Sequence, residues 1–161
     1  MKRNIYLALI ALLMSSSSLS AEDNGTVEMV SVSYQRVMVK DENGTLVETW
    51  PRATKVIPGT IVKYINTIVN TTDDNITDAN VSNPINENLI YQVDSANSEL
   101  NATILYSIDG GKSFDEPDNL KVGEGDNERK AYPEEYNAVL WSVKEIPHDS
   151  NCSLWFKVKL K

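Results

Sequence analysis

The residues of this chain with the most clearly defined chemistry are asparagines that stand two positions before a serine or threonine. With any residue except proline between, this is the acceptor pattern for N-glycosylation, in which the asparagine amide receives a glycan. Six of the seven also have an acidic residue two positions upstream, whereas Asn70 has Ile68 there. The six are Asn24, Asn43, Asn75, Asn80, Asn101 and Asn151.

The acidic extension resembles the acceptor of the bacterial periplasmic oligosaccharyltransferase system. The chain has 16 Asn, 23 acidic residues and 25 Ser plus Thr among 161 residues, so random placement gives about 0.4 matches. Turn chemistry is the alternative, because Asp-x-Asn-Gly-Thr suits a tight turn and would account for Asn43 and Asn24. It accounts less well for Asn80, Asn101 and Asn151, which we expect at or inside strand ends. We predict glycosylation at all six in a host that has the transferase.

No residues form a convincing catalytic, cofactor or metal site. His148 is the only histidine and lies in a loop, without a nucleophile motif nearby. One His and one Cys do not make a zinc site. The segment GEGDNE at 123–128 offers oxygen ligands for calcium but lacks the spacing of a known calcium loop, and acidic pairs such as Glu134 and Glu135 are typical of solvated loops. We predict a protein without catalytic activity or cofactor.

The segment SIDGGKSF at 107–114 fits the Asp-box pattern of sialidase-like propellers, where it is a structural hairpin. One copy in a chain too short for a propeller carries no enzymatic implication. Asp109, Gly110 and Gly111 suit a tight turn with positive φ.

The first 21 residues have the layout of a secretory signal peptide. Lys2 and Arg3 precede an apolar run from Ile5 to Met14, and small residues follow up to Ala21. The apolar run has ten residues, about half of what spans a bilayer of ~30 Å, so a signal anchor is the less favoured alternative. We expect cleavage after Ser20 or Ala21, no stable membrane insertion afterwards, and a periplasmic or surface location.

Residues 22–161 retain 13 basic and 23 acidic side chains, a net charge of −10. Such acidity argues against nucleic acid as a partner, since a polyanion would be repelled. Cys152 is the only cysteine, so an exported chain of this type cannot close an internal disulfide and must be stabilised by packing, by a metal or by a partner.

Period-two alternation with turn residues between the segments predicts an all-β fold. We expect strands over 27–39, 45–50, 60–70, 76–82, 88–94, 101–108, 137–144 and 152–160. DENG at 41–44 supplies a hairpin turn. Seven or more short strands without helices indicate an immunoglobulin-like antiparallel β-sandwich, in which 22–50 contributes N-terminal strands and 51–161 forms the main domain.

The last predicted strand separates two faces. Cys152, Leu154, Phe156, Val158 and Leu160 fall on the core face, with Cys152 expected as a small buried hydrophobe. On the other face Trp155 stands among lysines, either as part of a binding surface or packed on their aliphatic stems. Those lysines could instead protect an exposed strand edge.

From Pro51 onward the chain resembles the bacterial conserved-repeat family, domain of unknown function 11, in a single-copy secreted form. The resemblance rests on IPGTIVKYINTIVNTT at 57–72, VSNPINENLIYQVDS at 81–95 and LYSIDGGKSF at 105–114, followed by Arg129, Ala131, Tyr136 and Trp141. Thr60 stands where such domains usually have Asp, and Asn86 where they often have Pro. The resemblance implies an immunoglobulin-like sandwich on exported or surface proteins and no assigned activity.

These observations predict a non-catalytic exported envelope protein that is N-glycosylated in a bacterial periplasm. Its partner would be an envelope protein or glycan. The alternative is a carbohydrate- or protein-binding module that uses Trp155 or the acidic loops as an exposed aromatic or acidic face.

Overall fold

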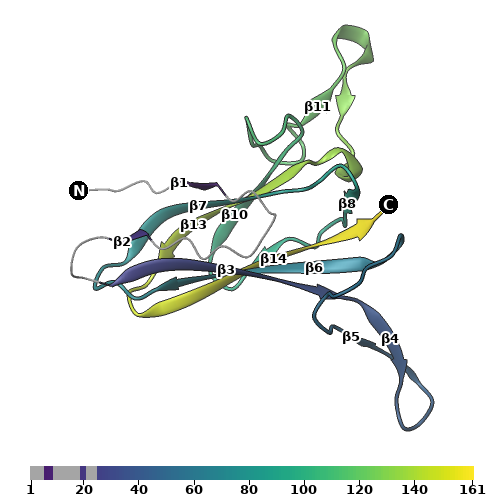
Figure 1. The fold of residues 1–161 in the computed structure, drawn as a ribbon. Coiled ribbons are helices and arrows are strands. Elements are labelled where there is room, and N and C mark those ends of the chain that lie inside the picture. Colours follow the sequence, from purple (N-terminus) through teal and green to yellow (C-terminus); the bar gives the residue numbers. More distant parts are fainter. Residues whose placement is uncertain (1–5, 9–18, 21–24) are drawn as a thin grey trace.

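The computed structural model describes residues 6–8, 19–20 and 25–161, with side chains from residue 25 onward. The described chain is all-β, with antiparallel pairing throughout its larger sheets except at one short parallel edge strand (Figure 1). Most of the predicted signal peptide, together with Asn24, lies outside the described residues. No helix in the described part has the length and apolar character needed to cross a bilayer.

Two larger sheets face each other in a sandwich-like arrangement (Figure 1). The first contains β2 (Leu19–Ser20), β3 (Thr26–Gln35), β6 (Ile61–Asn70), β14 (Ser150–Leu160) and β8 (Leu89–Tyr91) in that order, with β9 (Asn97–Ser98) also paired to β14. The second contains β1 (Tyr6–Ala8), β7 (Ile76–Pro84), β13 (Ala138–Ile146) and β10 (Ala102–Ser107). Small two-stranded sheets are formed by β4 (Val37–Lys40) with β5 (Leu46–Thr49) and by β11 (Lys121–Val122) with β12 (Arg129–Lys130). Short 3₁₀ turns occur at η1 (Gly125–Asn127) and η2 (Pro133–Glu135).

The core lies between the two larger sheets and follows the period-two pattern. Cys152, Leu154, Phe156 and Val158 of β14 face inward and are fully buried, as predicted, whereas Leu160 is only half-buried. Trp141 of β13 is also fully buried. Its ring centroid lies 5.8 Å from that of Phe156, and its Nε1 donates to the Asn97 carbonyl at 3.0 Å. The buried residues of both sheets form one core.

Cys152 is a buried core residue, which confirms the prediction. Burial raises the pKa of its thiol, since the charged thiolate is poorly solvated there. A raised pKa disfavours the reactive thiolate form. The side chain therefore behaves as a small hydrophobe.

The predicted strand over 27–39 is divided in the structure. β3 ends at Gln35, whose backbone N–H donates to the Pro51 carbonyl, and the Arg36 N–H donates to the Ile61 carbonyl. These bonds hold the chain at the sheet edge, and β4 and β5 continue as a hairpin that projects from the body (Figure 1). Alternation continues through the break, which is why the sequence showed one strand.

The predicted strand over 88–94 is shorter than expected. β8 ends at Tyr91 because 92–95 form a turn, in which the Ser95 N–H donates to the Gln92 carbonyl at 3.2 Å. Asp94 adopts φ = 55°, a left-handed conformation that Asp tolerates better than most residues. This turn becomes important for the cavities described below.

The Asp-box segment forms a structural loop, as predicted. The Asp109 carboxylate accepts hydrogen bonds from the hydroxyls of Ser107 and Ser113 and from two backbone N–H groups. Gly110 and Gly111 have φ of 80° and 82°. Both carboxylate oxygens of Asp109 thus accept hydrogen bonds from groups of the same loop and stabilise its conformation.

The strand order departs from that of constant-type immunoglobulin domains. With β3, β6, β7, β8, β10, β13 and β14 numbered one to seven, the sheets have orders 1-2-7-4 and 3-6-5. Constant-type domains have 1-2-5-4 and 3-6-7. The last strand therefore occupies the place of the fifth, and β13 and β14 lie in different sheets.

Candidate functional site

Five of the six predicted glycan acceptors lie in the described part of the chain. Asn43, Asn75, Asn101 and Asn151 are exposed, and Asn80 is half-buried, alternating with the buried Ala79 and Val81 of β7. N-glycosylation modifies the side-chain nitrogen Nδ2. At Asn75 the only side-chain bond among the described residues uses the other atom, Oδ1, which accepts from the His148 backbone N–H at 2.9 Å. Its Nδ2 is therefore free to be modified.

Asn70, the acceptor-like asparagine without an upstream acid, is different. Its side chain is fully buried. Its Nδ2 donates to the carbonyls of Asp74 and Pro147, each at 3.0 Å, and to that of Ile146 at 3.4 Å. Its Oδ1 accepts from the backbone N–H and the hydroxyl of Thr72. Asn70 is thus a structural residue that ties the end of β6 to two neighbouring loops.

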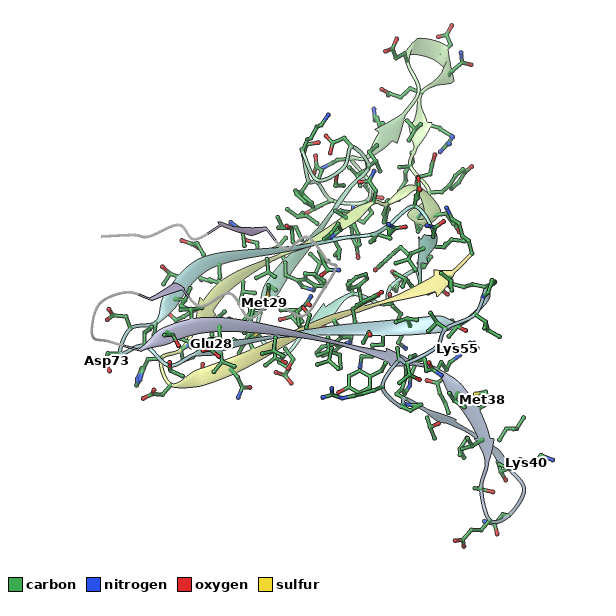
Figure 2. The ribbon with its side chains drawn as sticks, viewed as in Figure 1. Glu28, Met29, Met38, Lys40, Lys55 and Asp73 are labelled. Atoms are coloured by element: carbon green, nitrogen blue, oxygen red, sulfur yellow. The ribbon has the colours of Figure 1, made fainter. Side chains whose placement is uncertain are left out.

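Several of the upstream acids have structural roles of their own. Asp41 accepts from the N–H groups of Asn43 and Thr45 and so stabilises the β4–β5 turn. Glu99 accepts from the Ser153 N–H at 2.7 Å. Asp78 and Asp149 have left-handed φ values of 53° and 49°. Asp73 makes no side-chain hydrogen bond or ion pair among the described residues, and Figure 2 shows it at one end of the molecule.

The residues considered for catalysis do not come together. The His148 side chain is 60% exposed, and its nearest charged partner is Asp149 at 3.7 Å. The adjacent Ser150 hydroxyl donates to the Pro147 carbonyl instead of to the histidine. Within 25–161, no group of three or more His, Cys, Asp or Glu side chains is placed to hold a metal ion.

Trp155 lies on the outer face of β14, as predicted, but it is half-buried. Lys63 of the neighbouring β6 places its Nζ 5.1 Å from the Trp155 ring centroid. The ring therefore packs against a lysine of the neighbouring strand, which is not one of the β14 lysines that the sequence indicated.

A cavity with a volume of about 390 Å³ is lined in part by four tyrosines. Tyr91 of β8, Tyr106 of β10 and Tyr136 after η2 pack against one another, with centroid distances of 4.7–5.8 Å. Exposed Val93 and Tyr132 contribute to the lining, each with 59% of its surface accessible. We call this space the tyrosine cavity. An apolar cavity with a few polar groups is a common setting for a ligand site.

The hydroxyls in the tyrosine cavity leave one donor without a partner. The Tyr91 and Tyr106 hydroxyl oxygens lie 2.9 Å apart, and the Tyr91 oxygen also accepts from the Ala96 N–H at 3.1 Å. The Tyr91–Tyr106 bond uses one of the two hydroxyl protons, and no acceptor for the other is found among the described residues. Burial, followed by the bond to Tyr91, raises the pKa of Tyr106, so its hydroxyl stays protonated.

A second cavity of about 260 Å³ lies on the other side of the 92–95 turn. Trp50 stands in its wall, with the Lys157 Nζ 5.1 Å from the ring centroid and the Glu48 carboxylate accepting from Trp50 Nε1 at 2.8 Å. Arg36 and Gln92 add further polar groups. We call this space the tryptophan cavity. Val93 and Asp94 line both cavities and form the ridge between them.

Glu135 fixes the geometry around Tyr132 at the tyrosine cavity. Its carboxylate binds both terminal nitrogens of Arg129, at 2.7 and 2.8 Å, and accepts from the Tyr132 N–H. The Arg129 hydrogen bonds, followed by the Tyr132 N–H, lower the pKa of Glu135 to about 2. Because the folded pKa is depressed, the contribution of these bonds is present above the usual pKa of about 4.3 and is lost as the pH falls through about 2.

We therefore expect the Glu135 carboxyl resonance to titrate with a midpoint near 2 in an NMR pH series. A Glu135 midpoint at the ordinary glutamate value of about 4.3 would contradict the bidentate geometry.

The sequence did not reveal either cavity. Their walls come from segments far apart in the chain, and the separate residues give no motif. Four of the seven tyrosines and one of the three tryptophans line these two spaces. The sequence shows these aromatic residues but does not show that they lie together.

No family model matches the chain. No curated protein and no solved structure matches it either. The resemblance to the conserved-repeat family rests on the segments quoted above.

Proposed function

We propose that the chain is a non-catalytic, exported protein of a bacterial envelope that carries N-linked glycans. In this proposal residues 1–21 direct export, and the sandwich acts as a structural or interaction module in the periplasm or at the cell surface. The six acceptors are those with an upstream acid. The net charge of −10 for residues 22–161 agrees with a partner other than nucleic acid.

One observation carries the glycosylation proposal. The described asparagines with an upstream acid lie at or near the surface, whereas Asn70, which lacks the acid, is fully buried with its Nδ2 bonded to three carbonyls. The sequence pattern and the burial of the residue therefore separate the same asparagines. Turn chemistry alone would not require this agreement.

The family assignment and the immunoglobulin-like description remain part of the proposal. Two facing antiparallel sheets with one core between them support the architecture. Because β14 occupies a different place in the sheet order, 'immunoglobulin-like' describes the two-layer arrangement of the sheets and not the constant-type strand order. The family resemblance supplies the envelope location.

The two cavities favour a second candidate function, a binding module for a partner of the envelope. They lie away from the chain starts of β7, β10 and β14, where Asn75, Asn101 and Asn151 are found. Trp155 lines neither cavity and is therefore not the centre of this second candidate.

Asp73 gives the sharpest test of the acidic requirement. It makes no side-chain bond in the described part, so Asp73→Asn should leave the fold unchanged while removing the acid. We expect glycan occupancy at Asn75 to fall at least tenfold in the native host, measured by glycopeptide mass spectrometry. Asp73→Glu, which keeps the charge, should retain the occupancy.

Asn70 serves as the negative control, and Asn151 as the unaltered positive control in the same sample. An intact mass equal to that of the bare polypeptide would refute the glycosylation proposal. Equal occupancy of Asn75 in both Asp73 variants would assign the modification to a transferase that does not read the acid.

A further inference from the structure

The tyrosine and tryptophan cavities share one wall, and that wall is firmly held. Gln92 and Ser95, on either side of the Val93–Asp94 ridge, are both anchored to Lys157 of β14. The Gln92 N–H donates to the Lys157 carbonyl at 2.9 Å, and the Lys157 N–H donates to the Ser95 hydroxyl at 3.0 Å. The ridge is therefore a fixed partition between two adjacent hollows. A ligand longer than one cavity would cross it.

The charged groups around the cavities are balanced. Arg36 and Lys157 of the tryptophan cavity face Glu48 and Asp94. In the tyrosine cavity Asp94 stands with Lys130, which is itself bonded to Asp118. Neither hollow carries a surplus of one sign, which disfavours both polyanions and cationic ligands.

The polar groups that remain include both donors and acceptors. The spare hydroxyl proton of the Tyr91–Tyr106 pair and the Lys157 ammonium can donate. The Gln92 Oε1 can accept, because the hydrogen bond of this side chain to the Ile90 carbonyl uses Nε2. Aromatic rings stand on both sides of the ridge. A ligand with apolar faces and hydroxyls that both donate and accept would satisfy this set.

We propose that the two cavities form one binding site for a neutral oligosaccharide, with consecutive sugar units on either side of the Val93–Asp94 ridge. The apolar faces of the sugars would lie against Trp50 and the tyrosines, and their hydroxyls would bond to the groups named above. This inference deepens the binding-module candidate and does not depend on export or glycosylation.

Three of the predicted glycan acceptors lie away from this site. Asn75, Asn101 and Asn151 stand at the starts of β7, β10 and β14, whereas the cavities lie near β8, η2 and the end of β14. Figure 1 shows these as opposite ends of the sandwich. Glycans attached to these three would cover the end away from the cavities, whereas Asn43 stands in the β4–β5 turn, and β5 supplies Glu48 to the tryptophan cavity.

The test is isothermal titration of the protein from a host without an oligosaccharyltransferase, so that the outcome is independent of glycosylation. The probes are maltohexaose, cellohexaose, mannohexaose, xylohexaose, laminarihexaose and chitohexaose. We expect at least one to bind with a dissociation constant below ~1 mM. The corresponding monosaccharide should bind at least tenfold more weakly, because it cannot span the ridge.

Trp50→Ala and Tyr132→Ala, one for each cavity, should each weaken binding at least tenfold. Lys157→Gln is the second tryptophan-cavity variant in case Trp50→Ala disturbs the hairpin base. Trp155→Ala is the matched control and should leave the affinity unchanged. Circular dichroism checks the fold of each variant.

Three results would overturn the proposal. The first is that no neutral hexasaccharide binds at ligand concentrations up to ten times the expected dissociation constant. The second is that Trp155→Ala weakens binding as much as the cavity variants do. The third is that an octaproline peptide or a hexagalacturonate binds these cavities in place of the neutral sugars, which would assign them to a protein segment or to an acidic glycan.

Discussion

Replacing Trp141 with alanine should destabilise the protein more than any other single truncation in the core. The side chain is fully buried, packs on Phe156 and bonds the Asn97 carbonyl, so its removal leaves a large cavity and an unpaired acceptor. Truncating a buried tryptophan typically costs ~3–5 kcal/mol. Since a domain of this size has a total stability of only ~5–15 kcal/mol, the variant would be at the margin of folding.

Thermal and urea unfolding, followed by far-ultraviolet circular dichroism, measure this effect. The expected loss corresponds to a fall in Tm of roughly 10–15 °C. Trp141→Phe keeps most of the volume and should cost less, which separates packing from the hydrogen bond. Trp155→Ala is the surface control, and an equal loss in that variant would contradict the assignment of Trp141 as the centre of the core.

Replacing Asn70 with leucine should have the second largest effect. The substitution keeps a similar size but removes the Nδ2 donor from the carbonyls of Asp74, Ile146 and Pro147. Buried carbonyls that lose a partner cost ~1–3 kcal/mol each, less where water enters. We expect a total loss of about 3 kcal/mol in the free energy of unfolding, measured by urea titration.

Asn151→Leu is the matched control, because Asn151 is also an acceptor-like asparagine and its neighbour Ser150 stands opposite Asn70 in the β14–β6 register. Its side chain is exposed, so the change should stay within ~0.5 kcal/mol. If the two variants lost stability equally, the three-carbonyl contact of Asn70 would not be the cause. This comparison also tests whether Asn70, the asparagine without an upstream acid, has a role in stabilising the fold.

Alternation of side chains made most of the strands predictable. In β14, the even-numbered residues from 152 to 158 are buried because a strand places successive side chains on opposite faces. The turn at 41–44 and the Asp-box loop were predictable because each has local chemistry, with Asp41 and Asp109 bonding to N–H groups of their own loops. The sequence therefore predicted the strands and turns whose conformation depends on residues close together in the chain.

Features that depend on distant contacts were not predictable. The break at Arg36 depends on the Ile61 carbonyl, and the early end of β8 depends on the anchoring of 92–95 to Lys157. The cavities require Trp50, Tyr91, Tyr106 and Tyr136 to meet across the two sheets and the hairpin base. The structural roles of Glu99 and Asp78 were also hidden, because alternation does not show a side-chain bond to another strand or a left-handed backbone.

The β4–β5 hairpin offers a practical use. Its two strands pair only with each other among the described strands, and Figure 2 shows Met38 and Lys40 on a ribbon that stands clear of the body. Exposed tips of this kind accept insertions well. A short peptide tag in this turn would replace the Asp41 hydrogen bonds and the Asn43 acceptor but leave the core folded, and it would thus provide a tether for attaching the protein to a sensor surface.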